Sequence, residues 1–438
     1  MKILLISPLL TPQRTPEVYN IGLGYIAASL LEDGHNVNVL DIQGHKYPPQ
    51  KVIEEIKNTE CDVIGIGTLI TGYKYVEWLV REIRNLKPKV KIWIGNSVAS
   101  PIPEIILNNM AIDVVVAGEG EITVKELAIA TEKGEDLQKV KGIYFKQDGK
   151  IIKTPERELI PDIDAIPFPA WHLFPQEIYL KTRTGFMPSP RAFVITTRGC
   201  PYRCTYCYHP FQNQRVRFHS AERIIEEVKL LKSRYQVKSI LFGDDLFTVN
   251  KMRVYRICDL LEKERLNIKW MSSSRVDSID EDMLKRMKSA GCLCLGFGIE
   301  SGSQTILDNI KKQTTVEKSK RAIQLCKKVG IHPACSFMIG NVGETRETVL
   351  ETVSFVKEID LEPPIGFFFA TPYPGTELYD YAEKEGKIPD EISLFESYGE
   401  QSEELLVNVT KMSDDDLINL RKEAVGYSME QLYAPSSD

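Results

Sequence analysis

The sequence predicts an α/β protein with an N-terminal Rossmann-like, doubly wound parallel sheet, a partial (β/α)6 barrel, and a small helical C-terminal segment. Short apolar runs of strand length alternate with amphipathic helical segments, first over residues 1–140 and again over residues 191–384. A Pro-rich stretch, PDIDAIPFPAWHLFP, separates the two series. We therefore expect domains at 1–140 and 191–384, a hairpin and linker at 141–190, and a helical segment at 385–438.

The first series places small and polar residues where its strands end. The strand candidates are KILLIS, NVNVLDI, DVIGIGTLI, VKIWIGNS and DVVVAGEGE. Ligands of doubly wound sheets bind outside the carboxyl ends of the strands, and small residues let a large flat ligand approach the backbone. The candidate binding residues at these ends are Ser7, Asp41, Thr68, Leu69, Ile70, Thr71, Gly95, Asn96, Ser97, Gly118, Glu119 and Gly120.

The second series contains about six β/α units, two short of a full eight-fold barrel. Its strand candidates are AFVITTRG, SILFGDDLF, IKWMSSSRVD, CLCLGFGIES, HPACSFMIG and IGFFFATPY. Active-site groups of such barrels lie at the carboxyl ends of the strands. We expect the chemistry of this protein at that edge.

Composition excludes two classes of function. The chain has 438 residues, 43% hydrophobic and 26% charged, with a net charge of −6. Such a balance argues against a nucleic-acid binder that works through bulk electrostatics. No apolar run is long enough for a membrane span, and no signal-peptide cleavage pattern is present, so we expect a cytoplasmic protein without a membrane span.

The stretch RGCPYRCTYCYHPF, residues 198–211, holds three of the nine cysteines within eight positions. An intracellular chain of this size is not a disulfide scaffold, so the cluster indicates metal or redox chemistry. Cys200, Cys204 and Cys207 can ligate three irons of a [4Fe–4S] cluster and leave the fourth iron open to a small ligand. A zinc site with His209 as fourth ligand is the alternative that the spacing leaves open.

Four further motifs extend the pattern beyond the cysteine loop. RGCPYRCTYCYHP, ILFGDDLFT, GFGIESGS, FMIGNVGET and TPYPGTELY occur in the order typical of the cobalamin-binding branch of the radical S-adenosylmethionine (SAM) enzymes. The chain resembles that branch, most closely its C-methyltransferases, and its N-terminal half resembles the branch's B12-binding domain. The resemblance implies a [4Fe–4S] cluster, SAM and cobalamin, as methylcobalamin, as cofactors, and an electron donor such as ferredoxin or flavodoxin as partner.

The resemblance also implies roles for single residues. Cys200, Cys204 and Cys207 match the cluster ligands, and Tyr206 matches the residue whose backbone contacts adenine. Asp244 and Asp245 match the acids that accept from the methionine ammonium, and Arg275 can hold the SAM carboxylate. Solvated acids and a surface salt bridge are the plainer alternatives. Ser273 and Ser274 lie beside Arg275 as further SAM candidates, and Glu300 matches the position that accepts from the ribose hydroxyls. Thr371, Tyr373 and Pro374 stand at the last strand end, with Tyr373 as the catalytic candidate. Leu69 or Ile70 would lie against the lower face of the corrin.

One expected pattern is absent. Many B12 proteins carry Asp-x-His-x-x-Gly, whose histidine coordinates cobalt, but here the spacing around Asp41 and His45 is wrong. We expect His45 to be a surface residue. We also expect Cys292 and Cys294, two apart on a strand, to be buried core residues.

The function that the resemblance implies is methylation of an unactivated carbon, with a 5′-deoxyadenosyl radical as hydrogen abstractor and methylcobalamin as methyl donor. The substrate expectation is a peptide or protein side chain, because the C-terminal segment is short. The alternatives are ring formation or rearrangement without methyl transfer, methylation of a lipid or natural product, and a non-catalytic metal-binding protein.

Overall fold

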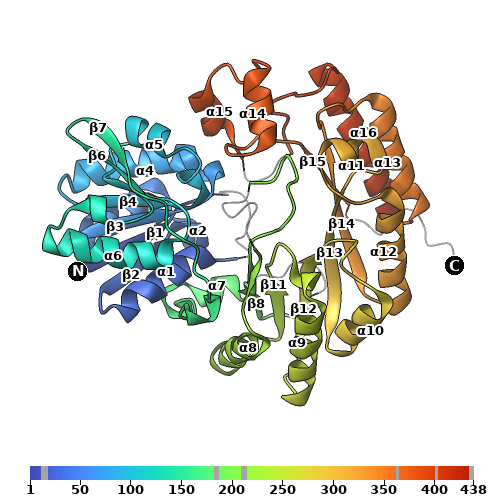
Figure 1. Cartoon of the computed structure of the whole chain (residues 1–438), viewed down its shortest axis with the longest axis horizontal. Coiled ribbons are helices and arrows are strands. Elements are labelled where there is room, and N and C mark those ends of the chain that lie inside the picture. Colours follow the sequence, from blue (N-terminus) through green and yellow to red (C-terminus); the bar gives the residue numbers. More distant parts are fainter. Residues whose placement is uncertain (11–17, 182–186, 209–214, 362–364, 400–402, 434–438) are drawn as a thin grey trace. The chain divides into compact units, whose positions relative to one another are not determined.

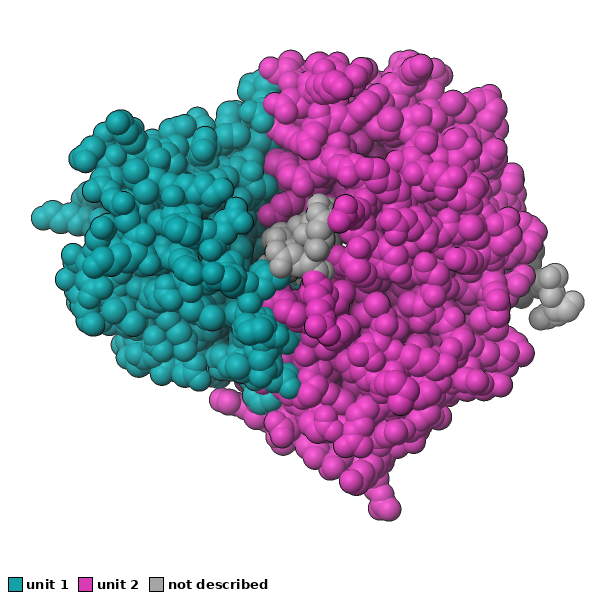
Figure 2. Space-filling view, in the orientation of Figure 1, with its two compact units in different colours: residues 1–184, 390–400 teal, residues 185–389, 401–438 magenta. Residues whose placement is uncertain are grey.

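The computed structural model describes residues 1–10, 18–181, 187–208, 215–361, 365–399 and 403–433 (Figure 1). The chain forms two compact units, coloured separately in Figure 2. The first unit comprises residues 1–184 and 390–400, and the second comprises residues 185–389 and 401–438. Among the described residues, no helix is long and apolar enough to cross a membrane.

The first unit is built on a seven-stranded sheet with the order β2-β1-β3-β4-β5-β6-β7. Strands β1 to β5 are parallel, which confirms the predicted doubly wound sheet. The order β2-β1-β3 places the topological switch point between β1 and β3, where open α/β sheets bind their ligands. The strands are β1 (Lys2–Ser7), β2 (Asn36–Asp41), β3 (Val63–Gly67), β4 (Lys91–Gly95), β5 (Val114–Val116), β6 (Ile143–Gln147) and β7 (Lys150–Lys153).

Helix α4 (Tyr73–Leu86) illustrates how the helices of the first unit pack. In α4 the residues Val76, Leu79, Val80 and Ile83 are at most 2% exposed, at the spacing of one helix face. The helices are α1 (Ile21–Glu32), α2 (Ile42–His45), α3 (Pro49–Asn58), α4 (Tyr73–Leu86), α5 (Pro103–Asn109), α6 (Gly120–Lys133), α7 (Gln176–Tyr179) and α15 (Glu391–Ser397), with 3₁₀ turns η1 (Ile70–Gly72), η2 (Asn96–Val98), η3 (Leu137–Lys139), η4 (Ile163–Ala165) and η5 (Trp171–Leu173).

The predicted hairpin is present and extends the first sheet. Strand β6 pairs antiparallel with both β5 and β7. The turn residues Asp148 and Gly149 have φ of 50° and 76°, as a two-residue turn of the Asp-Gly type requires.

The second unit is built on a six-stranded sheet in which every pairing is parallel. Its strands follow chain order, β8-β11-β12-β13-β14-β15, and helices line one side of it (Figure 1). This arrangement confirms the predicted partial (β/α)6 barrel. The strands are β8 (Arg191–Val194), β11 (Ser239–Phe242), β12 (Lys269–Ser274), β13 (Cys292–Glu300), β14 (His332–Ile339) and β15 (Gly366–Phe369), with a small separate ladder of β9 (Thr197–Arg198) and β10 (Arg217–Phe218).

An aromatic core of Phe242, Phe247 and Trp270 lies beneath this sheet, with ring centroids 5.0 to 5.6 Å apart. Cys292 and Cys294 are also buried, as expected. The helices of the second unit are α8 (Ala221–Tyr235), α9 (Lys251–Lys263), α10 (Glu281–Ser289), α11 (Gln304–Asn309), α12 (Val316–Val329), α13 (Arg346–Glu358), α14 (Glu377–Lys384) and α16 (Asp414–Tyr433), with the 3₁₀ turn η6 (Phe247–Val249).

Candidate active site

The cysteine loop follows β8 and β9 and is anchored by the ends of two other β/α units. The backbone N–H of Thr205 donates to the carbonyl of Ile310, just after α11, over 3.1 Å. The carbonyl of Thr205 accepts from the N–H of Leu378 in α14 over 2.9 Å. The loop therefore takes its shape from segments about 100 and 170 residues further along the chain.

The three cysteines of this loop share one electrostatic environment. Cys204 is buried, and Cys200 and Cys207 are half-buried. Burial first, and then the charges of Cys204, Asp245 and Cys200, raise the pKa of the Cys207 thiol to about 12. Bound iron would supply the positive charge that stabilises these groups as thiolates.

Three thiols on one loop are a donor set that suits a four-iron cluster. In the described part of the chain, no group of three or more His, Cys, Asp or Glu side chains converges on one metal position. A four-iron cluster does not require convergence, because each thiolate binds a different iron. His209, the fourth ligand of the zinc alternative, lies outside the described residues.

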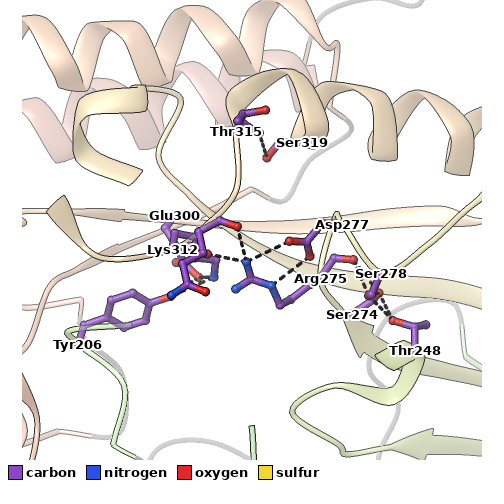
Figure 3. A network of polar contacts seen from close by, with 11 residues as sticks. Tyr206, Thr248, Ser274, Arg275, Asp277, Ser278, Glu300, Lys312, Thr315 and Ser319 are labelled. Atoms are coloured by element: carbon purple, nitrogen blue, oxygen red, sulfur yellow. Dashed lines mark hydrogen bonds and ion pairs between the residues drawn. The ribbon is translucent and has the colours of Figure 1, made fainter. Parts of the chain in front are cut away.

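A buried polar network stands beside the third cysteine (Figure 3). The hydroxyl of Tyr206 donates to Oε1 of Glu300 over 2.9 Å, and the ammonium of Lys312 donates to the same oxygen over 2.8 Å. The side chains of Lys312 and Glu300 are 10% and 12% exposed. Burial and the charge of Glu300 raise the pKa of Tyr206 well above its usual range, so this hydroxyl stays protonated and keeps donating.

The backbone of Glu300 is strained, and its side chain folds back over β13. Its φ is +67°, a conformation that costs a non-glycine residue on the order of 1 kcal/mol or more. A Cβ atom on Gly298 would lie only 2.2 Å from Oε1 of Glu300. The absence of a side chain at position 298 therefore makes room for the carboxylate above the strand.

Small residues surround that carboxylate on the same face of the sheet. Ser273 pairs in register with Gly296, and Gly296 with Ala334. Gly298 pairs in register with Ser336. Partners in register point to the same face, so this part of the sheet is left uncovered by its own side chains.

Arg275 lies close to the cysteine loop, but the chain itself engages its guanidinium. Nε donates to Asp277 over 3.1 Å, and Nη2 donates to the carbonyl of Lys312 over 2.5 Å (Figure 3). The guanidinium also stacks on the ring of Tyr202, 3.5 Å from its centroid. Because Tyr202 lies between two of the cysteines, Arg275 supports the loop, and its predicted contact with the SAM carboxylate would compete with these bonds.

The two acids after β11 have different surroundings. Asp244 is buried and accepts from the N–H groups of Thr196 and Thr197 over 2.5 and 2.8 Å, and from the hydroxyl of Thr196. Burial raises its pKa, and the charge of Arg253 opposes that shift. Asp245 is exposed, and its charge raises the pKa of Cys207. Asp245 is therefore the acid that faces the cysteine loop, whereas Asp244 braces the end of β8.

The predicted serines point to opposite faces of β12. Ser274 is buried and shares hydrogen bonds with Thr248 and Ser278, over 2.6 and 3.3 Å (Figure 3). Ser273 is exposed on the uncovered face. Only Ser273 is therefore available to a ligand.

The last strand end is used partly for helix capping. The hydroxyl of Thr371 donates to the carbonyl of Phe369 over 3.3 Å. The carbonyl of Tyr373 accepts from the hydroxyl of Thr376, which caps α14. The side chain of Tyr373 is half-buried, and Pro374 is buried.

In the first unit, the acidic side chains at the strand ends also make hydrogen bonds that hold neighbouring segments in place. Asp41 caps α2 by accepting from the N–H of Gly44 over 3.0 Å, and accepts from the hydroxyl of Tyr179 over 2.6 Å. Ser7 is buried and pairs in register with Asp41 on the neighbouring strand. Burial raises the pKa of Asp41. Glu119 accepts from the N–H of Ile160 over 2.7 Å and thereby holds the segment that follows the hairpin.

The end of β3 presents one large apolar side chain. Leu69 is 50% exposed, whereas Thr68 and Ile70 are buried. The N–H of Ile70 donates to the hydroxyl of Ser97 over 3.2 Å, which ties this turn to the end of β4. The other predicted residues at this edge are exposed or half-buried: Thr71, Gly95, Asn96, Gly118 and Gly120.

His45 is exposed at the end of α2, as expected of a surface residue. Its ring stacks on Tyr47, with centroids 4.7 Å apart and planes 5° from parallel.

Residues that sequence reasoning did not single out complete the site. Lys312, Tyr202 and Tyr179 each contact a predicted residue, and Arg253 donates to Thr196, which in turn bonds to the predicted Asp244. Lys312 is one of two adjacent lysines, and nothing in the sequence distinguishes the buried one from its exposed neighbour. Glu344 lies within the motif FMIGNVGET, so the motif itself could have drawn attention to it.

Comparisons with known proteins agree with this arrangement. Residues 194–356 match the radical SAM superfamily model, and residues 10–128 match the B12 binding domain model. The "Uncharacterized methyltransferase PH0819" of Pyrococcus horikoshii is 39% identical over 365 residues, covering 83% of this chain and 78% of that protein. The anaerobic magnesium-protoporphyrin IX monomethyl ester cyclase of Rubrivivax gelatinosus is 27% identical, covering 85% of this chain and 67% of the cyclase.

A solved structure shares the fold across both units. The radical SAM methyltransferase TsrM from Kitasatospora setae, determined with cobalamin and a [4Fe–4S] cluster, superposes with a TM-score of 0.72 at 19% identity. The match covers 88% of this chain and 78% of TsrM. With the identity to the Pyrococcus protein and the two domain matches, these findings show that the chain belongs to the cobalamin-binding radical SAM enzymes, the family whose cofactors are a [4Fe–4S] cluster, SAM and cobalamin.

Proposed function

We propose that this chain is a cobalamin-dependent radical SAM methyltransferase that methylates an unactivated carbon. The observation that carries the proposal is the carboxyl edge of the six-stranded sheet. There a loop with three cysteines lies beside a preorganised carboxylate, Glu300, above a face of small residues. Family membership and the methyltransferase names of relatives support methyl transfer as the outcome.

In the second unit, Cys200, Cys204 and Cys207 would hold the cluster. Glu300 would accept from the ribose hydroxyls of SAM, and we assign its methionine part to Asp245 and Ser273, which are exposed at the strand ends. When bound, these cofactors and cobalamin supply an abstracting radical and a methyl group. The chain's own work is to bind them, to orient the target carbon and to exclude water. A reduced cytoplasmic ferredoxin or flavodoxin would deliver the electron.

In the first unit, the carboxyl edge of β1, β3, β4 and β5 would hold the corrin. Leu69 is the residue we assign to its lower face, because it is exposed at the switch point while Ile70 is buried. Ser7, Asp41 and Glu119 would act indirectly, since their polar atoms hold the neighbouring turns.

The substrate proposal changes in the light of the relatives. The peptide or protein side chain expected from the short C-terminal segment has no counterpart in the names of the proteins compared. The Rubrivivax cyclase is named for a porphyrin ester, and TsrM has also been determined with tryptophan as substrate. We therefore place a small molecule first and a peptide side chain second.

The first experiment is elemental. The protein, produced and purified without oxygen and reconstituted with iron, sulfide and hydroxocobalamin, should hold about four irons and about one cobalt per chain. Reduced protein should then cleave SAM to 5′-deoxyadenosine. Replacing Cys200, Cys204 or Cys207 by Ala should abolish cleavage, whereas Cys61→Ala in the first unit should not. Full cleavage by any variant of the first three would remove the cluster assignment.

The second candidate function is cyclisation without methyl transfer, which the cyclase among the relatives favours. SAM labelled in its methyl group separates the two outcomes once a substrate is turned over. Methyl transfer should put label into the product, whereas a cyclase should form 5′-deoxyadenosine with an unlabelled product.

A further inference from the structure

Lys312 is a buried cation at the centre of the candidate site, and no part of the proposed function yet uses it. It lies between α11 and α12 and is 8% exposed. Its ammonium donates to Oε1 of Glu300 over 2.8 Å and to the hydroxyl of Tyr206 over 3.1 Å. A lysine this deeply buried is uncommon in proteins unless it is paired.

The backbone around Lys312 is held as firmly as its side chain. Its N–H donates to the carbonyl of Leu307 over 2.9 Å, and its carbonyl accepts from Nη2 of Arg275 over 2.5 Å. Arg275 in turn stacks on Tyr202 of the cysteine loop. Lys312 therefore contacts Glu300 at the end of β13 and Arg275 just after β12. Through these contacts it is connected to Tyr206 and Tyr202, which lie at two positions of the cysteine loop.

The Glu300 carboxylate has one oxygen engaged and one open. Oε1 accepts hydrogen bonds from the hydroxyl of Tyr206 and the ammonium of Lys312. Within the described residues, Oε2 has no hydrogen-bond partner. The side chain is 12% exposed and lies over the small-residue face of β13. The open oxygen is therefore presented to whatever occupies that face.

Charge is the second property that Lys312 brings. Its ammonium donates to the hydroxyl of Tyr206 over 3.1 Å, and Tyr206 directly precedes Cys207, so a fixed positive charge lies beside the cysteine loop. A four-iron cluster becomes more negative when it takes up an electron. A fixed positive charge nearby favours the reduced form, because local charge is one of the factors that set cluster potentials.

We propose that Lys312 is a positioning residue for SAM and for the redox properties of the cluster. It fixes the Glu300 carboxylate so that Oε2 meets the ribose hydroxyls, and its charge makes the cluster easier to reduce. This inference rests on the proposed function, since it takes SAM and the cluster as the ligands of this site.

The test compares Lys312→Met with Lys311→Met in the full-length, reconstituted protein. Lys311 is the adjacent lysine, its side chain is 52% exposed, and it pairs with the exposed Glu377. Three quantities are measured: iron per chain, the dissociation constant of SAM by equilibrium dialysis, and the midpoint potential of the cluster by a redox titration followed by electron paramagnetic resonance.

Lys312→Met should weaken SAM binding at least tenfold and move the midpoint potential to more negative values, with iron content unchanged. Lys311→Met should change neither quantity. Lys312→Arg should restore the potential, because the charge returns. It should restore SAM affinity only in part, because the guanidinium does not reproduce the geometry of the ammonium. Wild-type affinity and potential in Lys312→Met would overturn the inference.

Lys312→Met leaves the Glu300 carboxylate buried without its cation, and this loss can unfold the protein. A second comparison, made in the Glu300→Gln background, keeps the inference testable in that case. On the background of Glu300→Gln, adding Lys312→Met should cause no further loss of SAM affinity but should still lower the potential. Additive losses of affinity would show that Lys312 does not act through Glu300. A wild-type protein that holds no iron or binds no SAM would instead contradict the proposed function, whatever the variants do.

Discussion

At the scale of single residues, Glu344 shows how burial alters a group that the sequence presents as ordinary. It is 2% exposed at the end of β14, and its Oε2 accepts from the N–H groups of Gly340 and Asn341. Its other oxygen, Oε1, is buried without a hydrogen-bond partner in the described residues. Burial outweighs the two backbone bonds and raises the pKa of Glu344 to about 7.

This shift makes stability depend on pH. The folded protein binds the Glu344 proton more tightly than the unfolded chain does, so the associated stability is present at low pH. It is lost as pH rises from the unfolded pKa, near 4.5, through about 7. Glu344→Gln keeps an oxygen for both N–H groups and cannot ionise. Between pH 5 and pH 8, the wild type should lose up to about 3 kcal/mol of unfolding free energy relative to this variant.

Urea unfolding at the two pH values measures that difference. Glu347→Gln, an exposed acid in the first turn of α13, is the control and should not reproduce it. Parallel pH profiles of wild type and Glu344→Gln would show that Glu344 titrates in its ordinary range.

Gly298 and Gly296 offer a matched comparison at the candidate site. A Cβ atom at position 298 would lie 2.2 Å from Oε1 of Glu300, whereas one at position 296 would make an ordinary contact of 3.6 Å with Ser273. Gly298→Ala should displace the carboxylate, separate it from Lys312 and weaken SAM binding at least tenfold, which corresponds to about 1.4 kcal/mol. Gly296→Ala should weaken binding less. Equal dissociation constants for the two variants would argue that Glu300 does not bind SAM.

At the scale of elements, helix ends follow rules that are readable from sequence. Helices of the second unit begin after side chains that accept from the first-turn N–H groups, as Ser220, Asn250, Asp280 and Thr315 do. Thr345 forms a full capping box with Thr348 at the start of α13. These signals are local, and for this reason the alternation of helices and strands was predictable.

Helix α15 could not be placed by such signals. We expected residues 385–438 to form one C-terminal segment, yet residues 390–400 group with the first unit. The anchor is Phe395, which is fully buried and packs on Tyr73 of α4 with ring centroids 5.5 Å apart. Elements far apart in sequence thus share one hydrophobic contact beside η1, the turn that follows Leu69.

Removing that anchor should destabilise the first unit. Phe395→Ala deletes a fully buried aromatic ring, which costs about 3–5 kcal/mol of unfolding free energy in comparable cores. Cobalamin binding should weaken as well, because α15 supports η1. Denaturant unfolding and cobalamin titration measure the two effects. Met252→Ala, at a side chain that is 73% exposed, is the control and should change neither. Unchanged unfolding in Phe395→Ala would mean that α15 does not support the unit.

At the scale of the whole molecule, each unit has its own sheet and its own buried core. Cofactor loading should therefore be separable, because the ligands we assign to the cluster and to the corrin belong to different units. Reconstitution without hydroxocobalamin should still give about four irons per chain. The triple variant of Cys200, Cys204 and Cys207 to Ala should lose iron but retain cobalt. Loss of iron when hydroxocobalamin is left out, or loss of cobalt in the triple variant, would show that the two sites depend on one another.

The sequence by itself determined the class of the molecule. Two series of alternating strands and helices predicted two sets of parallel strands, and both sets are present, β1 to β5 in the first unit and the six-stranded sheet in the second. Three cysteines at a fixed spacing, with five motifs in order, predicted the family. Such features were readable because side-chain periodicity is a local property and cluster ligation depends on residue type and spacing along one loop.

Only the tertiary structure decided which polar groups are available to a ligand. Asp244 and Asp245 are adjacent, yet the first is buried against Thr196 while the second is exposed. Lys311 and Lys312 are adjacent, yet only Lys312 reaches Glu300. The physical reason is that burial and hydrogen-bond partners come from distant segments, which the chain brings together only when its core has packed.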